Sequence, residues 1–312
     1  MIKTLSSSVF KIFSISILLL MISTEFNFGE KTYSFETEEF KKFWYSGKAE
    51  ITSYKLEQAR YGEIHEGYAV LVFVTEDFSL KKHVKLDNPN DSKEDSVKVL
   101  KLNLIKKFNT GIYRYSMMTS IFTPTHFQEF PYSLKDTTTS QEWCGHTFTQ
   151  LNLDGNFYDV KQYSYFESEG DEEYEIEKAL LEDSVWNMIR IDPKTLPTGK
   201  VKIIPSTLAA RLTHIKPEVR IATAELNPDQ SNDELLNYSI TYKNPSRKLK
   251  ITFQKDFPYE ITEWEESYIS GWGPSAKELT TKAVRNKSIK VDYWNKNRDL
   301  DKKLRKDLGL DN

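Results

Sequence analysis

The stretch YSLKDTTTSQEWCGHTFTQLNLDGNFYDVKQYSYFESE, residues 132–169, decides the fold that the sequence predicts. Residues that favour β-strands, chiefly Thr, Tyr, Phe and Val, alternate with polar residues on both sides of Asp154-Gly155. This dipeptide is a strong hairpin signal because Gly tolerates the positive φ that a tight turn demands. The stretch therefore predicts a long antiparallel hairpin near the middle of the chain.

The same pattern of short alternating runs and polar turns continues on both sides of this hairpin. The continuous apolar run AVLVFV, residues 69–74, is typical of a strand buried on both faces. Asn244-Pro245-Ser246 lies between two alternating runs and predicts another hairpin turn. The sequence thus predicts a mainly β (α+β) fold, with a large curved antiparallel sheet or half-open barrel.

A few segments depart from the strand pattern. Apolar residues recur at helical spacing in EIEKALLEDSVWNMIRI, so we expect one inserted amphipathic helix over residues 174–190, ended by Asp192-Pro193. A short entry helix is expected at residues 33–45, with Ser34 as its N-cap. We therefore predict a single antiparallel β domain over residues 31–296 and a C-terminal helical tail over residues 297–312.

The N-terminus and the composition restrict localisation and partners. Lys3 and Lys11 precede the apolar run Ile12 to Ile22, which predicts a signal peptide within residues 1–30. The alternative is a membrane anchor formed by residues 9–24. Both alternatives predict export. A cleaved signal peptide would release the protein into the periplasm or the medium, and an uncleaved anchor would hold it at the inner membrane. The formal charge of −3 excludes the strong positive field that would attract a nucleic acid.

The strongest candidate for catalysis is the pair Cys144 and His146, with Glu142 beside it. On a strand, a spacing of two residues would place all three side chains on one face, where an imidazole can activate a thiol. The alternative is a small buried thiol beside Trp143. Because no other motif supplies an oxyanion hole, we expect a non-enzymatic protein, with a Cys/His-dependent hydrolase or transferase as the alternative.

Neither a metal nor a cofactor is predicted. The five histidines are scattered without the close pairs of a zinc site. The segment from Gly271 to Ala276 matches the loose dinucleotide-binding pattern G-x-G-x-x-A, but its flanks read as strands, so we interpret it as a Gly-rich hairpin.

The chain is rich in aromatic residues, with 17 Tyr, 18 Phe and 6 Trp, and this composition favours binding of an apolar ligand. A concave sheet lined with aromatic side chains can hold an apolar ligand. We expect such a ligand beneath the predicted helix, in contact with Val185, Trp186, Ile189 and Trp143. The predicted partner is therefore a lipid or another apolar ligand, or alternatively another envelope protein.

Several segments carry a resemblance to a known family. They are FWYSGKAEITSYKLEQARYGE from Phe43, GIYRYSMMTSIFTP from Gly111, SQEWCGHTFTQLN from Ser140, PTGKVKIIPS from Pro197 and WEESYISGWGPSAKELTTKAVR from Trp264. With these segments the chain resembles an uncharacterised family of bacterial envelope proteins often labelled septum formation inhibitor Maf. That label implies a nucleotide pyrophosphatase or a division factor, although the Ser-x-Ser-Pro-Arg-Arg loop of Maf pyrophosphatases does not occur here. The predicted architecture also looks like the LolA/LolB half-barrels, which bind acyl chains.

Overall fold

The computed structural model describes residues 36–127 and 129–310, which form one compact unit. The predicted signal or anchor in residues 1–30 lies outside the described residues, and so does Ser34.

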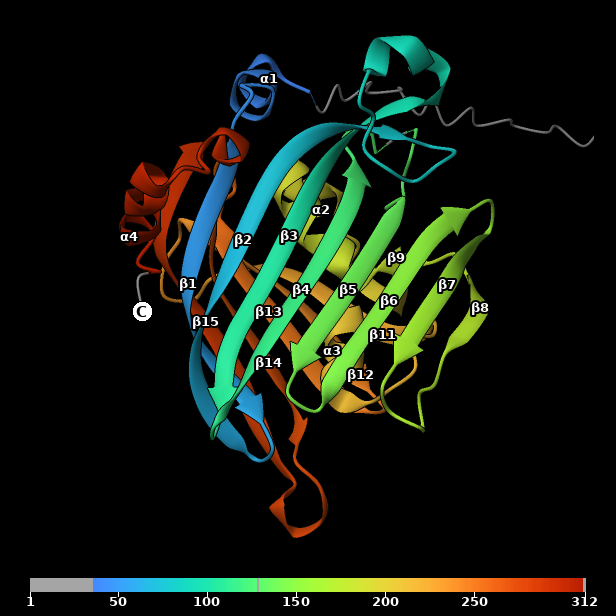
Figure 1. The fold of residues 1–312 in the computed structure, drawn as a ribbon, viewed down its shortest axis with the longest axis vertical. Helices are drawn as coiled ribbons and strands as arrows, with labels where there is room; N and C mark the ends of the chain where they lie inside the picture. Colours follow the sequence, from blue (N-terminus) through green and yellow to red (C-terminus); the bar gives the residue numbers. More distant parts are fainter. Residues whose placement is uncertain (1–35, 128, 311–312) are drawn as a thin grey trace, which may run out of the picture. The chain divides into compact units, whose positions relative to one another are not determined.

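The mainly β class is confirmed, because fifteen strands of the described chain join in one curved, mostly antiparallel sheet (Figure 1). The strands are β1 (Ala49–Arg60), β2 (Glu63–Ser79), β3 (Ser96–Thr110), β4 (Tyr113–Pro124), β5 (Lys135–Glu142), β6 (Gly145–Asp154), β7 (Phe157–Ser164), β8 (Glu172–Glu177), β9 (Leu180–Leu181), β10 (Gly199–Ile204), β11 (Arg220–Pro228), β12 (Leu235–Lys243), β13 (Ser246–Gln254), β14 (Ile261–Ser270) and β15 (Lys277–Val291). The α-helices within these residues are α1 (Glu38–Trp44), α2 (Val185–Ile191), α3 (Thr207–Thr213) and α4 (Lys303–Asp307).

The sheet consists of two meanders that are joined at their first and last strands. Strands β1 to β8 follow one another in space as in sequence, and β9 to β15 do the same on the other side. The two halves meet where β1 pairs antiparallel with β15, as in the pair Ile51 and Ile289. Every other pairing of the described strands is antiparallel except that of β9 with β10. Most antiparallel neighbours are joined by short turns, whereas α2 lies in the connection between the parallel pair β9 and β10.

The central hairpin is confirmed. Strands β6 and β7 pair across Asp154 and Phe157, and Gly155 at the turn has φ of 55°, a conformation that strongly favours glycine. The stretch also contains a hairpin that was not predicted. Strand β5 ends at Glu142, and Trp143 and Cys144 form the turn to β6.

The predicted helix over residues 174–190 is wrong in its first half. Residues 172–177 form the edge strand β8, in which Ile176 is buried while Glu173, Glu175 and Glu177 are exposed. Apolar residues here fit a period of two as well as a period of 3.6, and pairing with β7 selects the strand. The helix α2 is only seven residues long and buried throughout. The entry helix is confirmed as α1, but Thr37 is its N-cap, accepting a hydrogen bond from the Phe40 amide at 3.1 Å.

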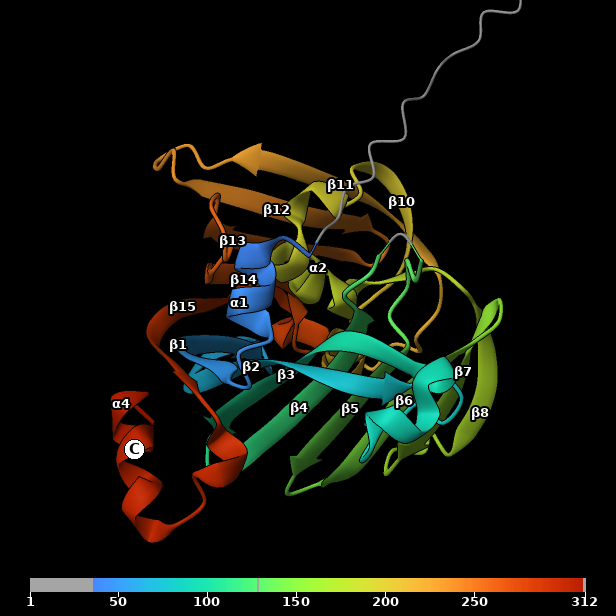
Figure 2. The same ribbon diagram turned by 90° about the horizontal axis from the view of Figure 1, so that it is seen from above.

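The curved sheet encloses its own core. Figures 1 and 2 show α2 between the layer of β2 to β5 and the layer of β11 to β14, and α3 lies against β4 and β5. Inward side chains of both halves form one cluster with α2, including Leu71, Leu102, Ile251 and Trp264. The run 69–74 is buried on both faces, as predicted, because Leu308 and Leu310 of the C-terminal tail cover its outer face.

Strand β8, at one edge of the sheet, approaches β10 and the residues after α3 in the other half. Lys202 of β10 lies 3.7 Å from Glu177 of β8, and Tyr174 of β8 donates a hydrogen bond to the Pro217 carbonyl at 3.4 Å. The exposed glutamates of β8 protect this edge, because charged side chains oppose pairing with another chain.

Candidate functional site

Six turns of the meanders gather at one end of the sheet, which we call the turn end. They connect β1 to β2, β3 to β4, β5 to β6, β7 to β8, β12 to β13, and β14 to β15. The C-terminus of α3 lies at the same end, because α3 connects the last residue of β10 to the first of β11. In Figure 1 these turns are at the bottom of the view. The turn end therefore assembles side chains that are far apart in the sequence.

Aromatic side chains form a connected series around the turn end, which we call the aromatic rim: Tyr61, Tyr113, Trp143, Tyr165, Phe166 and Trp272. The ring centroids are 6.4 Å apart for Trp143 and Tyr113, 5.4 Å for Tyr61 and Trp272, and 5.5 Å for Tyr165 and Phe166. The Tyr113 hydroxyl donates a hydrogen bond to the Tyr61 hydroxyl at 3.0 Å. The His214 ring connects Trp272 and Phe166, with centroid distances of 6.0 Å and 5.1 Å. Tyr165 also lies close to Gly145, which follows Trp143 and Cys144 in the chain, so the series closes on itself. A Cβ at Gly145 would come within 2.4 Å of the Tyr165 ring. Only glycine allows this approach.

The rim is solvent-exposed to an unusual degree for large apolar groups. The exposed fractions are 71% for Trp143, 67% for Tyr165, 58% for Trp272 and 85% for the adjacent Ile112. Contiguous exposed aromatic groups mark sites of interaction in soluble proteins.

Two buried arginines lie inside the rim. The Arg60 guanidinium lies 4.3 Å from the centroid of the Tyr61 ring, and its Nε donates to the Tyr115 hydroxyl at 3.4 Å. Arg60 also donates to the Leu212 carbonyl and thereby fixes the end of α3. The Arg211 guanidinium lies 4.5 Å from the centroid of Phe166. These contacts hold both cations among aromatic faces, which favour cations over neutral groups.

Carboxylates complete the surroundings of Arg211. Its Nη2 lies 3.6 Å from Oε1 of Glu142, and its Nη1 lies 3.3 Å from Nε2 of His214. The other ring nitrogen of His214 lies 2.6 Å from Oε1 of Glu169. Burial alone would raise the pKa of Glu169, but hydrogen bonds from His214 and Ser164 lower that pKa below its ordinary value.

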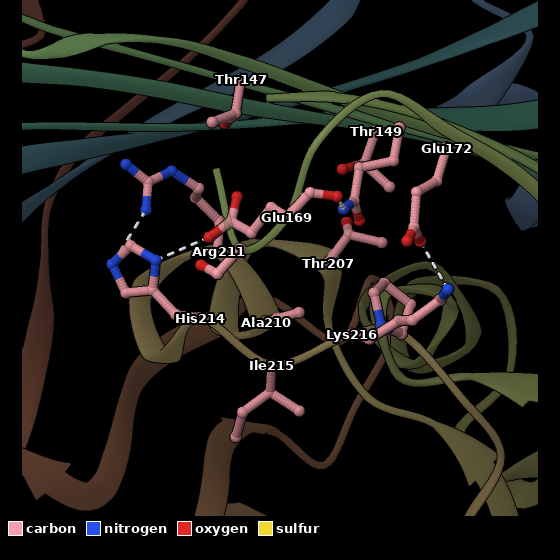
Figure 3. Close-up of a pocket in the computed structure, with 13 residues that line it drawn as sticks. Thr147, Thr149, Glu169, Glu172, Thr207, Ala210, Arg211, His214, Ile215 and Lys216 are labelled. Carbon is pink, nitrogen blue, oxygen red and sulfur yellow. Dashed lines mark hydrogen bonds and ion pairs between the residues drawn. The ribbon is translucent and has the colours of Figure 1, made fainter. Parts of the chain in front are cut away.

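A pocket of about 200 Å³ opens beside these groups, between α3 and the inner face of β6 to β8 (Figure 3). The sheet contributes Thr147, Thr149 and Glu172, and the β7–β8 turn contributes Glu169. The opposite wall consists of α3 and the residues that follow it, including Arg211, His214 and Lys216. Lys216 is ion-paired with Glu172 across the pocket. The lining is thus mixed, since Glu169 and Glu172 pair with His214 and Lys216 while Ala210, Ile215 and Pro217 contribute apolar surface.

The structure separates the three residues predicted to form a catalytic group. The expectation that they share one strand face is wrong, because Cys144 lies in the β5–β6 turn. Glu142 is buried on the inner side, whereas His146 pairs with Gln141 and is exposed. Cys144 is exposed, and a hydrogen bond with Glu142 raises the pKa of its thiol. A protonated thiol is a poor nucleophile.

The residues predicted to contact an apolar ligand lie in two places. Val185 and Ile189 are fully buried, and Trp186 packs edge-on against Trp264 at 5.2 Å between centroids. The space that Trp186 lines measures about 20 Å³ and is shared with charged groups such as Lys106 and Glu266. That is room for about one water molecule. Trp143, in contrast, belongs to the exposed rim.

The charged groups beside Trp186 form a buried network. Arg247 binds Glu182 through two nitrogens at 2.5 and 2.6 Å and Glu266 at 2.7 Å, and Lys106 lies 3.7 Å from Glu266. Nearby, Asp183 accepts a hydrogen bond from the Thr207 amide at 3.0 Å. Burial and the neighbouring Asp183 carboxylate raise the pKa of Asp136 well above its ordinary value. This network connects α3 and the turn just before α2 to strands of both halves of the sheet.

Arg60, Arg211, Glu169 and the pocket were not predicted as site residues. Their sequence neighbours give no motif, since Arg60 ends β1, Arg211 lies in α3 and Glu169 lies in the β7–β8 turn. The one available signal was the density of aromatic residues next to glycines in turns, as in Tyr61-Gly62 and Gly271-Trp272-Gly273.

No protein-family model, no curated protein and no solved structure matches the chain. Within residues 36–127 and 129–310, no cluster of three or more potential ligand side chains is arranged to hold a metal ion. No helix of that part of the chain has the length and apolar character needed to cross a bilayer.

Proposed function

We propose that this chain is a non-enzymatic, exported protein of the cell envelope that binds another envelope protein through the aromatic rim. The observation that carries the proposal is the exposure of Trp143, Tyr165 and Trp272 on turns that meet at one end of the sheet. Export and the envelope location rest on the signal-like residues 1–30 and on the resemblance to the envelope family.

The composition of the rim favours a protein partner over a bilayer. Protein interfaces are enriched in Trp, Tyr and Arg, and a few such residues provide most of the binding free energy. Surfaces that bind membranes combine apolar side chains with exposed basic residues. Here Arg60 and Arg211 are buried, and Arg211 lies beside Glu142 and Glu169.

Two observations favour this form of the function over the alternatives. The pKa of Cys144 is raised, and His146 faces away from Glu142, which argues against a Cys/His-dependent hydrolase or transferase. The space of about 20 Å³ beside Trp186 is too small for an acyl chain, which argues against a lipid beneath α2.

The experiment compares proteins that co-purify from the host's envelope fraction with the wild-type chain and with Trp143→Ala/Trp272→Ala. We expect the partner's affinity to fall at least tenfold, because truncating a central aromatic residue costs about 2 kcal/mol or more. Trp294→Ala is the matched control, since Trp294 is 45% exposed and follows β15 at the opposite end of the sheet. Equal recovery with the rim variant, or recovery of lipid alone, would refute the proposal.

A further inference from the structure

A hollow of about 570 Å³ lies on the outer face of β5 to β7 and is open to solvent. Sites for small molecules occupy about 300–1,000 Å³. Phe148 and Tyr163 line the hollow, whereas Leu151 and Val160, an odd number of residues away on the same strands, lie in the core. Because side chains alternate between the two faces of a sheet, Phe148 and Tyr163 point outward. Tyr165 of the rim borders the hollow, but most of the remaining lining belongs to the strands.

Two aromatic rings form an apolar surface in this hollow. Phe148 lies opposite Tyr163 in register, with ring centroids 6.2 Å apart and an angle of 28° between the ring planes. Tyr163 is 41% exposed, and its hydroxyl donates a hydrogen bond to Glu173 of β8 at 3.2 Å. This hydrogen bond restrains the ring from its far end. Two roughly parallel rings are therefore arranged to contact a flat guest before it binds.

Side chains that form hydrogen bonds without a fixed charge lie next to the rings. Thr139 of β5 is opposite Phe148 in register, and the exposed pair Gln141 and His146 forms the next row toward the turn end. All of the residues that line the hollow are described, and none of them is Lys or Arg. The one carboxylate of the lining, Asp171, accepts a hydrogen bond from a backbone amide of β7 at 3.3 Å.

This lining favours one class of ligand over two others. An acyl chain would contact the rings but would displace water from Thr139, Gln141 and His146 without replacing its hydrogen bonds, which lowers affinity. An anion would meet no Lys or Arg, the side chains that usually pair with anions. A pyranose sugar matches both parts of the lining, because its C–H groups form an apolar face and its hydroxyl groups project from the edge of the ring.

We propose that this hollow binds a neutral oligosaccharide of pyranose units. Its sugar rings stack on Phe148 and Tyr163, and its hydroxyl groups form hydrogen bonds with Thr139, Gln141 and His146. The site goes beyond the proposed docking function, because it uses the outer face of the sheet and not the turns. A chain with both sites binds a polysaccharide on this face and a protein at the rim.

The test is isothermal titration calorimetry of the full chain with cellotetraose, chitotetraose and maltotetraose as probes. We expect saturable binding of at least one of them at concentrations up to about 10 mM, the range of weak specific binding. Sorbitol has hydroxyl groups but no ring, and octanoate has an apolar chain without hydroxyl groups, so both should bind more weakly than that oligosaccharide. Absence of saturable binding of all three oligosaccharides, or equally tight binding of sorbitol or octanoate, would overturn the proposal.

Variants of the lining locate the site. Tyr163 and Gln141 are exposed, so the fold should tolerate their replacement. Tyr163→Ala should weaken binding at least about fivefold, because it removes a stacking surface, whereas Tyr163→Phe keeps the ring and should retain most of the affinity. Gln141→Ala should weaken binding at least about twofold through a lost hydrogen bond.

Two further variants are controls. Tyr293 is 36% exposed and follows β15 at the opposite end of the sheet, so Tyr293→Ala should leave binding of the oligosaccharide unchanged. Trp272→Ala should also leave it unchanged, which separates this test from that of the rim. Equal effects of Tyr163→Ala and Tyr293→Ala would place the ligand elsewhere and contradict the assignment.

Discussion

Glu142 determines the chemistry of the single cysteine. The Glu142 carboxylate accepts a hydrogen bond from the Cys144 backbone amide at 2.8 Å. A separate hydrogen bond between this carboxylate and the Cys144 thiol raises the pKa of the thiol. We expect Glu142→Gln to lower this pKa and to accelerate alkylation by iodoacetamide at pH 8 several-fold, because more thiolate is present. His146→Ala is the control and should leave the rate unchanged. A wild-type thiol that reacts rapidly at pH 7 and slows in His146→Ala would revive the catalytic pair.

Asp136 makes stability depend on pH. Its pKa in the folded protein is raised by burial and by Asp183. Below its ordinary pKa, near 4, the carboxyl group is protonated in both states and its contribution to stability is fully present. The contribution is lost as the pH rises through the folded-state pKa, because the unfolded chain releases the proton more easily.

Replacing this carboxyl group tests the sign. We expect Asp136→Asn to reduce the loss of stability between pH 5 and pH 8, measured by urea denaturation, because an amide does not ionise there. Asp233→Asn, at an exposed loop position, should follow the wild type. A stability profile of Asp136→Asn parallel to that of the wild type would show that folding does not raise the pKa of Asp136.

At the scale of elements, a buried ion pair holds α2 against β1. Arg190 binds Glu50 through both terminal nitrogens, at 2.7 Å for Nη2, and its Nε donates to the Pro258 carbonyl at 2.9 Å. Both side chains are almost fully buried. We expect Arg190→Met to lower the free energy of unfolding by about 3–5 kcal/mol, because it leaves a buried carboxylate unpaired.

The double variant Glu50→Gln/Arg190→Met provides the matched comparison. It should recover part of the loss, since no unpaired charge remains. Urea denaturation of the single and double variants measures the coupling. Additive effects of the two substitutions would mean that the pair does not stabilise α2.

Sequence patterns predicted the strands better than the helix and the site. Hairpins at Asp154-Gly155 and Asn244-Pro245 have local causes, and the structure confirms both. Residues 172–177 fit two periods, so only pairing with β7 determines their strand conformation. The rim and the pocket depend on which turns meet at one end of the sheet. Arg60 and Arg211 become neighbours through the β1–β2 hairpin and α3, a long-range consequence of topology that no local pattern contains.

At the scale of the whole molecule, the C-terminal tail covers an apolar area on the outer face of the sheet. Leu308 and Leu310 pack with Ile51, Val70 and Val72, and Ser53 donates a hydrogen bond to the Leu308 carbonyl at 2.5 Å. We expect Leu308→Ala/Leu310→Ala to lower the free energy of unfolding by roughly 3 kcal/mol in urea denaturation. Leu300→Ala is the control, since Leu300 is largely exposed. An unchanged stability would mean that the tail does not contribute to the fold.

Site-specific photo-crosslinking in host cells tests the central claim, that the rim binds an envelope protein, most directly. A photoreactive amino acid replaces Trp143 in one variant and Trp294 in another, two exposed positions at opposite ends of the sheet. We predict a discrete protein adduct from position 143, absent from position 294 and lost when Trp272→Ala is added. No protein adduct at position 143, adducts to lipid alone, or the same adducts at both positions would contradict the account.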